Sequence, residues 1–265
     1  MAVEAARAGG AVLSSKFLSA RTIEFKDERP SNLVTDADKA SERVVLDVLR
    51  KRAPGHAIVA EESGLTAGTS EFTWYVDPLD GTTNYAHQVP HFCVSIGVAR
   101  GPTLLAAAIY DPIRSELFSA AAGHGAFSNG VRLKASATQS LDRALLCTGF
   151  PYDVQSRPEA PVGLFTRIVL RARGIRRMGS AALDLAYVAA GRFDGFFEFG
   201  LKPWDTAAGM LLVQEAGGRA CRIDGAPFDL ACGDVLAAGP GLFDSLSQET
   251  RGFIGGIGWK PDARA

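Results

Sequence analysis

Blocks of apolar and polar residues along the chain predict helices and strands that alternate from one end to the other. Strands are expected where β-branched and aromatic residues gather, at 57–60, 74–76, 93–100, 103–110, 117–121, 144–149 and 193–199. Helices are expected at 3–19, after Thr35, at 180–190 and at 206–216. With no long linker and no internal repeat between them, these elements predict a layered α/β fold.

Three local signals mark where elements begin or end. Asn129-Gly130 favours a tight turn and therefore a hairpin. Thr35 and Asp38 have the spacing of a capping box at the start of a helix. Gly217-Gly218 closes the helix expected at 206–216. Asp38 therefore has a structural interpretation as a helix cap, beside any chemical one.

Two carboxylates stand directly after the apolar run at 74–76. Asp77 and Asp80 flank Pro78, which prevents a regular helix from starting there, and Gly81 permits a tight turn. Such a turn can aim both carboxylates at one point. A helix cap or a solvated turn is the ordinary interpretation of an isolated pair of this kind.

Further acidic residues at other element boundaries favour a metal site. They are Asp36 and Asp38, Glu61 and Glu62, and Asp205. Hard oxygen ligands gathered together suit Mg²⁺ bound with a substrate phosphate, and the N–H groups after Gly81 would meet that phosphate at a helix N-terminus. Asp205 lies more than a hundred residues after the others, so the site would require the two halves of the chain to pack together.

These motifs, in this order, resemble the inositol monophosphatase family of Mg²⁺-dependent, lithium-sensitive phosphatases. The resemblance covers nearly the whole chain and implies a homodimer and the αβαβα five-layer sandwich shared with fructose-1,6-bisphosphatase. We expect one compact catalytic unit, with most metal ligands in an N-terminal half at 1–140 and Asp205 in a C-terminal half at 141–265. The residues that carry the resemblance are Glu61-Glu62-Ser63, Asp77-Pro78-Leu79-Asp80-Gly81-Thr82-Thr83-Asn84, Arg177-Met178-Gly179-Ser180-Ala181-Ala182 and Trp204-Asp205.

The resemblance also implies a set of metal ligands. Glu61, Asp77 and the carbonyl oxygen of Leu79 would hold a first Mg²⁺. Asp77, Asp80 and Asp205 would hold a second, and a third, weaker ion would sit near Glu61. Direct attack of a metal-activated water on the phosphate then needs no phosphoenzyme.

Other residues take their expected roles from the same resemblance. Asp38 and Thr82 would orient or deprotonate the attacking water. Lys26 matches a basic residue on the family's N-terminal loop, although an exposed lysine with no specific role fits as well. Gly179 and Ser180 are small and would leave the first amides of the following helix open to a ligand. The residues expected on the substrate side are Gly81, Thr82, Ser180, Ala181, Glu198 and Asp205.

Composition agrees with a soluble globular enzyme. A hydrophobic content of 47% supports a substantial core, and a net charge of −1 attracts neither nucleic acid nor an anionic membrane. No apolar run approaches a membrane span and the N-terminus lacks a signal-peptide pattern, so we expect a cytoplasmic protein. The four cysteines have no C-x-x-C spacing and lie mainly in apolar surroundings, which predicts buried, reduced thiols.

Inositol 1-phosphate or a related small phosphate ester is the expected substrate. Thr83-Asn84 favours the inositol branch over branches that act on histidinol phosphate, fructose 1,6-bisphosphate or a nucleotide 3′-phosphate, although all share the metal core. Lys202 and Pro203 resemble bacterial rather than animal members, which leaves the leaving-group pocket open.

A regulator that binds RNA or protein is the alternative from another class. Its contact surface would be a run of arginines, whose ordinary interpretation is a solvated face. The acidic set argues against this alternative, because clustered carboxylates repel RNA phosphates. The arginines of the run are Arg167, Arg171, Arg173, Arg176 and Arg177.

Overall fold

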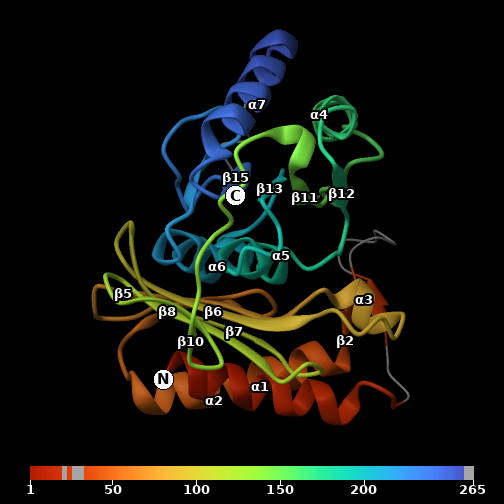
Figure 1. Ribbon diagram of the computed structural model, residues 1–265. Coiled ribbons are helices and arrows are strands. Elements are labelled where there is room, and N and C mark those ends of the chain that lie inside the picture. Colours follow the sequence, from red (N-terminus) through yellow and green to blue (C-terminus); the bar gives the residue numbers. More distant parts are fainter. Residues whose placement is uncertain (20–22, 26–32, 260–265) are drawn as a thin grey trace.

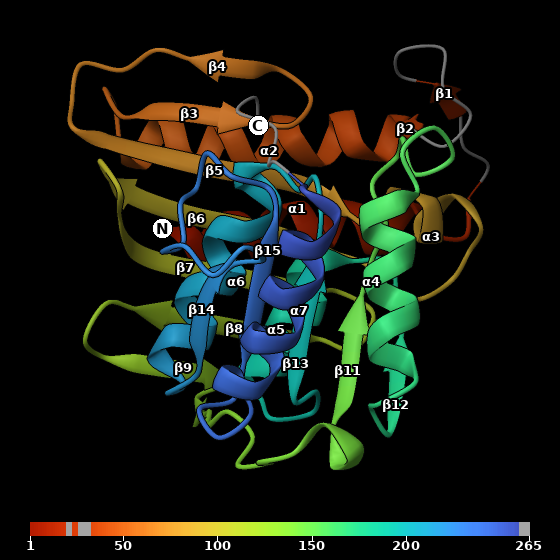
Figure 2. The ribbon, with the colours of Figure 1, turned by 90° about the horizontal axis from the view of Figure 1, so that it is seen from above.

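Helices and sheets stack in five layers (Figure 1). The computed structural model describes residues 1–19, 23–25 and 33–259. Two helices cover the outer face of the larger sheet, two lie between the sheets, and two cover the outer face of the smaller sheet (Figures 1 and 2). In that order they are α1 (Ala2–Lys16) and α2 (Asp36–Arg52), α5 (Ala181–Ala189) and α6 (Pro203–Glu215), and α4 (Glu159–Val169) and α7 (Phe243–Ile257). The predicted αβαβα sandwich is confirmed.

The larger sheet has eight strands in the order β10-β9-β8-β7-β6-β5-β3-β4. Only β3 and β5 pair in parallel, and the other neighbours are antiparallel. The strands are β3 (Ala57–Ala60), β4 (Gly64–Thr66), β5 (Phe72–Asp80), β6 (Cys93–Arg100), β7 (Thr103–Asp111), β8 (Glu116–Ala121), β9 (Gly125–Ser128) and β10 (Val131–Arg132).

The smaller sheet has five strands in the order β12-β11-β13-β15-β14. Here β11 is parallel to both β12 and β13, so the carboxyl ends of these strands lie at one edge. The strands are β11 (Leu145–Thr148), β12 (Gly174–Arg176), β13 (Gly195–Glu198), β14 (Arg219–Arg222) and β15 (Val235–Ala238). The shorter elements are β1 (Ile23–Phe25) paired with β2 (Leu33–Thr35), α3 (Thr82–Ala86) and a 3₁₀ turn at Leu141–Arg143.

Helix α6 is buried on almost every side because it lies between the two sheets. Its residues from Thr206 to Val213 are all buried. Gly97 on β6 lets the helix approach closely, since a Cβ there would come within 2.8 Å of the Ala207 Cβ and 3.1 Å of the Ala208 nitrogen. The position of α6 matters for the site because its first turn carries Asp205.

Most predicted elements lie where the pattern places them. The strands expected at 57–60 and 93–100 have the predicted bounds, and Asn129 and Gly130 take the positive φ values of 47° and 82° that a hairpin turn requires. Six elements are not among those expected, α4, α7, β4, β12, β14 and β15, and the four strands among them have only three or four residues each.

One boundary is wrong in an informative way. The strand expected to end at Val76 continues as β5 through both carboxylates to Asp80. Its ladder with β6 shifts register between Asp77 and Asp80, which is the irregularity of a bulge. Pro78 explains the shift, because it has no N–H to give to the ladder.

Two other predictions concern the cysteines and membrane spans. All four cysteines, Cys93, Cys147, Cys221 and Cys232, are buried and unpaired, as predicted. Among the helices of the described residues, none has the length and apolar character that crossing a membrane would require.

Candidate active site

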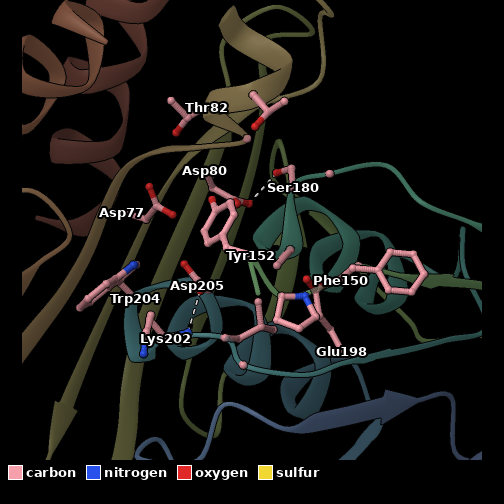
Figure 3. Close-up of a pocket in the computed structure, with 18 of the residues that line it drawn as sticks. Asp77, Asp80, Thr82, Phe150, Tyr152, Ser180, Glu198, Lys202, Trp204 and Asp205 are labelled. Carbon is pink, nitrogen blue, oxygen red and sulfur yellow. Dashed lines mark hydrogen bonds between the residues drawn. The ribbon is translucent and has the colours of Figure 1, made fainter. Parts of the chain in front are cut away.

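The bulge in β5 turns Asp77 and Asp80 into the space between the two sheets. Both residues are buried, with side chains aimed at the same cavity (Figure 3). Asp77 Oδ1 accepts a hydrogen bond from the Leu79 N–H at 2.9 Å. Asp80 Oδ2 accepts one from Ser180 Oγ at 2.5 Å and one from the Ala182 N–H at 2.8 Å. Asp80 therefore joins the larger sheet to the start of α5.

This contact corrects one expectation. The amides at the start of α5 were expected to stand open to a ligand, but the Ala182 N–H binds Asp80 instead. The reason is electrostatic, because a helix N-terminus attracts the nearest carboxylate, and Asp80 lies within reach. Ser180 and Ala181 still line the cavity, so their role towards a substrate stays a prediction.

Asp205 reaches the same cavity from α6. Pro203 occupies the first turn of this helix, and the Lys202 N–H donates to Asp205 Oδ2 at 2.7 Å. Asp205 thus caps α6, while Figure 3 shows its carboxylate facing those of Asp77 and Asp80. The cavity has a volume of about 250 Å³, and Glu61 also lines it.

The charges of these four carboxylates act on one another. Burial raises the pKa of Asp77 well above its ordinary value, and three neighbouring carboxylates raise it further. Burial likewise raises the pKa of Asp205 and brings that of Asp80 to about 6. The three neighbours of Asp77 are Glu61, Asp80 and Asp205. Ionised together in one cavity, these groups need a compensating cation.

The chemistry of the donor set fits Mg²⁺. Carboxylate and carbonyl oxygens are the hard ligands that this ion takes together with a substrate phosphate. Glu61, Asp77, Leu79, Asp80 and Asp205, the five predicted ligands, all line the one cavity. In the described part of the chain, no three carboxylate, histidine or cysteine side chains already converge on one point. The fit therefore rests on donor type, shared cavity and unbalanced charge.

Asp38 and Thr82 lie side by side, as the resemblance implied. Thr82 Oγ1 lies 3.1 Å from Asp38 Oδ1 and 3.0 Å from the Leu79 carbonyl oxygen. The other Asp38 oxygen accepts hydrogen bonds from the Thr35 N–H at 2.8 Å and from Thr35 Oγ1 at 2.6 Å. Asp38 is thus both the cap of α2 and the partner of Thr82. Burial raises its pKa to about 6 despite these hydrogen bonds.

Gly81 makes the turn between β5 and α3 with a φ of 96°, a conformation that favours glycine. A Cβ there would lie 3.0 Å from the His91 carbonyl oxygen. Asn84 braces the same turn, because its Nδ2 lies 2.8 Å from the carbonyl oxygens of both His91 and Met178. The turn is therefore fixed beside the acidic cavity, where the predicted phosphate cradle would be.

Glu198 ends β13 and lies beneath the backbone of Gly149. A Cβ at Gly149 would come within 2.1 Å of Glu198 Oε1, so a larger residue there would require the end of the Glu198 side chain to move. Burial raises the pKa of Glu198 to about 8, against the opposing charge of Arg177. Glu198 lines the same cavity as the acidic cluster, which is the position expected of a substrate-side residue.

The sequence analysis missed part of the cavity wall. Phe150, Tyr152, Arg177 and Lys202 line the cavity, but the sequence predicts a specific site role for none of them, although Arg177 belongs to a segment that carries the resemblance. A signal existed for the first two, because loops that follow the carboxyl ends of parallel strands commonly form ligand sites. Lys26, the possible loop residue, lies outside the described residues.

Comparison with known proteins gives this fold and cavity a family. The sequence model of the inositol monophosphatase family matches residues 1–253. The chain is 43% identical to a Nus factor SuhB of Salmonella typhimurium, over 95% of this chain and 94% of that protein. It is also 43% identical to an inositol-1-monophosphatase of Synechocystis, over 94% of this chain and 86% of that protein.

A solved structure leads to the same family. The inositol monophosphatase of Anabaena superposes with a TM-score of 0.85 at 45% identity, covering 94% of this chain and 92% of that one. The chain therefore belongs to the inositol monophosphatase family.

Proposed function

We propose that the protein is a Mg²⁺-dependent phosphomonoesterase that hydrolyses inositol 1-phosphate or a closely related small phosphate ester. The observation that carries this proposal is the meeting of Asp205 with Asp77 and Asp80 in one buried cavity. Carboxylates from one strand of the larger sheet and from a helix between the sheets destabilise the fold when they face one another, because like charges repel. A bound cation removes that cost.

The residues around the cavity have separable roles. When bound, Mg²⁺ neutralises the phosphate and lowers the pKa of a water. Ionised Asp38 accepts a hydrogen bond from the Thr82 hydroxyl and so keeps it oriented. The oxygen of that hydroxyl can then accept a hydrogen bond from the attacking water. In this proposal the N–H groups after Gly81 would bind the phosphate, while Glu198 would accept hydrogen bonds from hydroxyl groups of the leaving group.

The number of ions, sensitivity to lithium, a homodimer and a cytoplasmic location belong to the same proposal. Two or three Mg²⁺ ions are supported by the number of carboxylates in the cavity. A reducing, cytoplasmic environment is supported by four unpaired cysteines. The homodimer and the lithium sensitivity are supported by the family resemblance, and light scattering and lithium titration of activity would test them.

The test is release of inorganic phosphate, with and without Mg²⁺, from a panel of compounds. The panel holds inositol 1-phosphate, glycerol 2-phosphate, histidinol phosphate, fructose 1,6-bisphosphate and 3′-phosphoadenosine 5′-phosphate, with Asp80→Asn as control. We expect Mg²⁺-dependent release with a preference for inositol 1-phosphate, lost in Asp80→Asn. Preference for another compound of the panel would overturn the assignment of the substrate. No release of phosphate by folded protein would overturn the phosphatase assignment.

A second candidate function is a regulatory role through binding of RNA or another protein. It is favoured by similarity, because the relative named Nus factor SuhB matches this chain as closely as the relative named inositol-1-monophosphatase. The arginine run gives it little support. Arg167 and Arg171 both pair with Glu249, and Arg177 lines the cavity. Nucleic-acid binding at physiological salt that persists in Asp80→Asn would support this second role.

A further inference from the structure

The loop at 149–158 places a tyrosine over the acidic cavity. Tyr152 lines that cavity, and Figure 3 shows its ring in front of the space between Asp80 and Asp205. The residue is nevertheless 54% exposed. Burial and the charges of the four carboxylates raise the pKa of its phenol. Tyr152 therefore has one side towards the carboxylates and one side towards solvent.

The loop that carries Tyr152 is fixed at its base. Gly149 packs closely against the carboxyl group of Glu198, and a Cβ at Gly200 would lie 3.1 Å from the Pro151 Cβ. Phe150 packs edge-on against Phe165 of α4 at a ring distance of 5.7 Å. The two residues before Tyr152, Phe150 and Pro151, are thus held by contacts with other parts of the chain.

Hydrogen bonds fix the loop on the other side of Tyr152 as well. The Val154 N–H donates to the Pro151 carbonyl oxygen at 3.0 Å, which closes a tight turn around Tyr152. The Ser156 and Arg157 N–H groups donate to the Asp153 carbonyl oxygen at 2.9 and 3.0 Å. A side chain presented by such a turn acts as a fixed wall of the cavity.

The cavity behind this wall is small. Its volume of about 250 Å³ lies below the roughly 300–1,000 Å³ of pockets that hold drug-sized ligands. Part of that space must hold the phosphate and its cations, so little remains for the leaving group. On this basis, and resting on the proposed phosphatase function, we propose that Tyr152 is a specificity-determining residue that restricts the leaving group to a small polyol.

Truncation of the ring should widen the substrate range. We compare kcat/KM for two phosphate monoesters, glycerol 2-phosphate and the bulky bicyclic 4-methylumbelliferyl phosphate, in wild type, Tyr152→Ala and Tyr152→Phe. For each protein, kcat/KM for the bulky ester is divided by kcat/KM for glycerol 2-phosphate. Dividing this ratio by that of wild type cancels the different intrinsic reactivities of the two esters. We expect Tyr152→Ala to raise the ratio in favour of the bulky ester by about tenfold or more. Tyr152→Phe keeps the ring and should leave the ratio within about twofold.

A binding measurement distinguishes a residue that only limits the space for the leaving group from one that takes part in the reaction. The inhibition constant of inorganic phosphate should stay within about twofold of wild type in Tyr152→Ala, because the phosphate side of the cavity is unchanged. Leu170→Ala, an 81% exposed position at the end of α4, serves as the matched surface control. All variants are compared after their thermal unfolding transitions have been shown to match.

Each outcome decides the proposal. An unchanged ratio in Tyr152→Ala overturns it, as does an equal loss of both activities together with weaker phosphate inhibition, which would assign Tyr152 to the reaction itself. If wild type hydrolyses neither ester nor inositol 1-phosphate in Mg²⁺, the proposed function fails and this inference fails with it. If wild type is active, the ratio tests Tyr152 alone.

Discussion

Asp38 and Asp205 each stabilise the start of a helix, and Asp205 also lines the cavity while Asp38 contacts Thr82, which lines it. Asp38 caps α2 through Thr35 and contacts Thr82, and Asp205 caps α6 through Lys202 while facing the acidic cluster. From the sequence, capping and catalytic interpretations compete for Asp38, because both need a carboxylate at an element boundary. In the structure one side chain makes both contacts, with one oxygen accepting from Thr35 and the other from Thr82, and the catalytic role stays a prediction.

Thr82 offers a direct test of the catalytic pair. We expect Thr82→Val to lower kcat by about 10² to 10⁴-fold, because the hydroxyl that Asp38 orients is lost. Stabilisation of the folded protein by Mg²⁺ should persist, since Thr82 is not among the expected ligands. The measurement is steady-state phosphate release beside a Mg²⁺ titration of the unfolding temperature.

Thr250→Val is the matched control for that substitution. Thr250 is also buried, lies in α7 and is not among the residues that line the cavity. Its hydroxyl donates to the backbone carbonyl oxygen of Ile223 at 3.0 Å. Both variants should lose about 1 kcal/mol of stability, but only Thr82→Val should lose activity. Equal activity of the two variants would remove Thr82 from the reaction.

Glu198 makes stability depend on pH. Its pKa is about 8 in the folded protein against an ordinary 4.5, so between these values the folded state keeps a proton that the unfolded chain has released. Stability from this group is therefore lost progressively as pH rises from about 4.5 to 8, and the loss is complete above that range. Urea unfolding at several pH values, without Mg²⁺, measures it.

The matched variant is Glu198→Gln, which keeps the shape and removes the titration. We expect its stability to fall less steeply than that of wild type between pH 4.5 and 8, with the gap between the two proteins widening as pH rises. Parallel curves would show that Glu198 is not protonated in the folded protein. The remaining pH dependence in both proteins comes from the other buried groups with shifted pKa values. The pKa is raised for Asp38, Asp77, Asp80, Asp184 and Asp205 and lowered for His91.

At the scale of elements, local chemistry decided what the sequence could predict. The hairpin at Asn129-Gly130 follows from two residues that tolerate positive φ. The extent of β5 does not follow from its own residues, because a proline usually ends a central strand. Pro78 is tolerated here because it lies at a bulge. Short elements such as β12 and β14 depend on neighbours brought together by the fold, which a local pattern does not contain.

The contact between β6 and α6 fixes the position of Asp205, which lies in the first turn of α6. We expect Gly97→Ala to destabilise the protein by about 1–3 kcal/mol, because its Cβ would press on Ala207 and Ala208, which are held by the helix backbone. Activity should fall as well, since a shift of α6 moves Asp205. Denaturant unfolding and phosphate release measure the two effects.

Gly252 in α7 is the control for that substitution. A Cβ there meets nothing within 4 Å, so Gly252→Ala should stabilise the protein by about 0.5–1 kcal/mol and leave activity unchanged. If Gly97→Ala proved as stable and active as Gly252→Ala, the close approach of β6 to α6 would not be what holds the site together.

At the scale of the whole molecule, the site exists only because two halves pack. Asp77 and Asp80 come from the larger sheet, while Asp205 comes from the helix layer between the sheets. The candidate ligands could be named from motifs, whereas the only signal for Phe150 and Tyr152 is that their loop follows a strand of the smaller sheet. No local chemistry marks these two residues, and they reach the cavity only through the position of the loop after β11.

The central claim is that Asp205 completes a Mg²⁺ site with carboxylates of the other half. The most direct measurement is Mg²⁺-dependent release of phosphate from inositol 1-phosphate by wild type and Asp205→Asn at equal Mg²⁺ concentrations. The control is Asp244→Asn on α7, whose side chain is 80% exposed. We predict a loss of at least about a hundredfold in Asp205→Asn and none in Asp244→Asn. Full activity of folded Asp205→Asn would contradict the account.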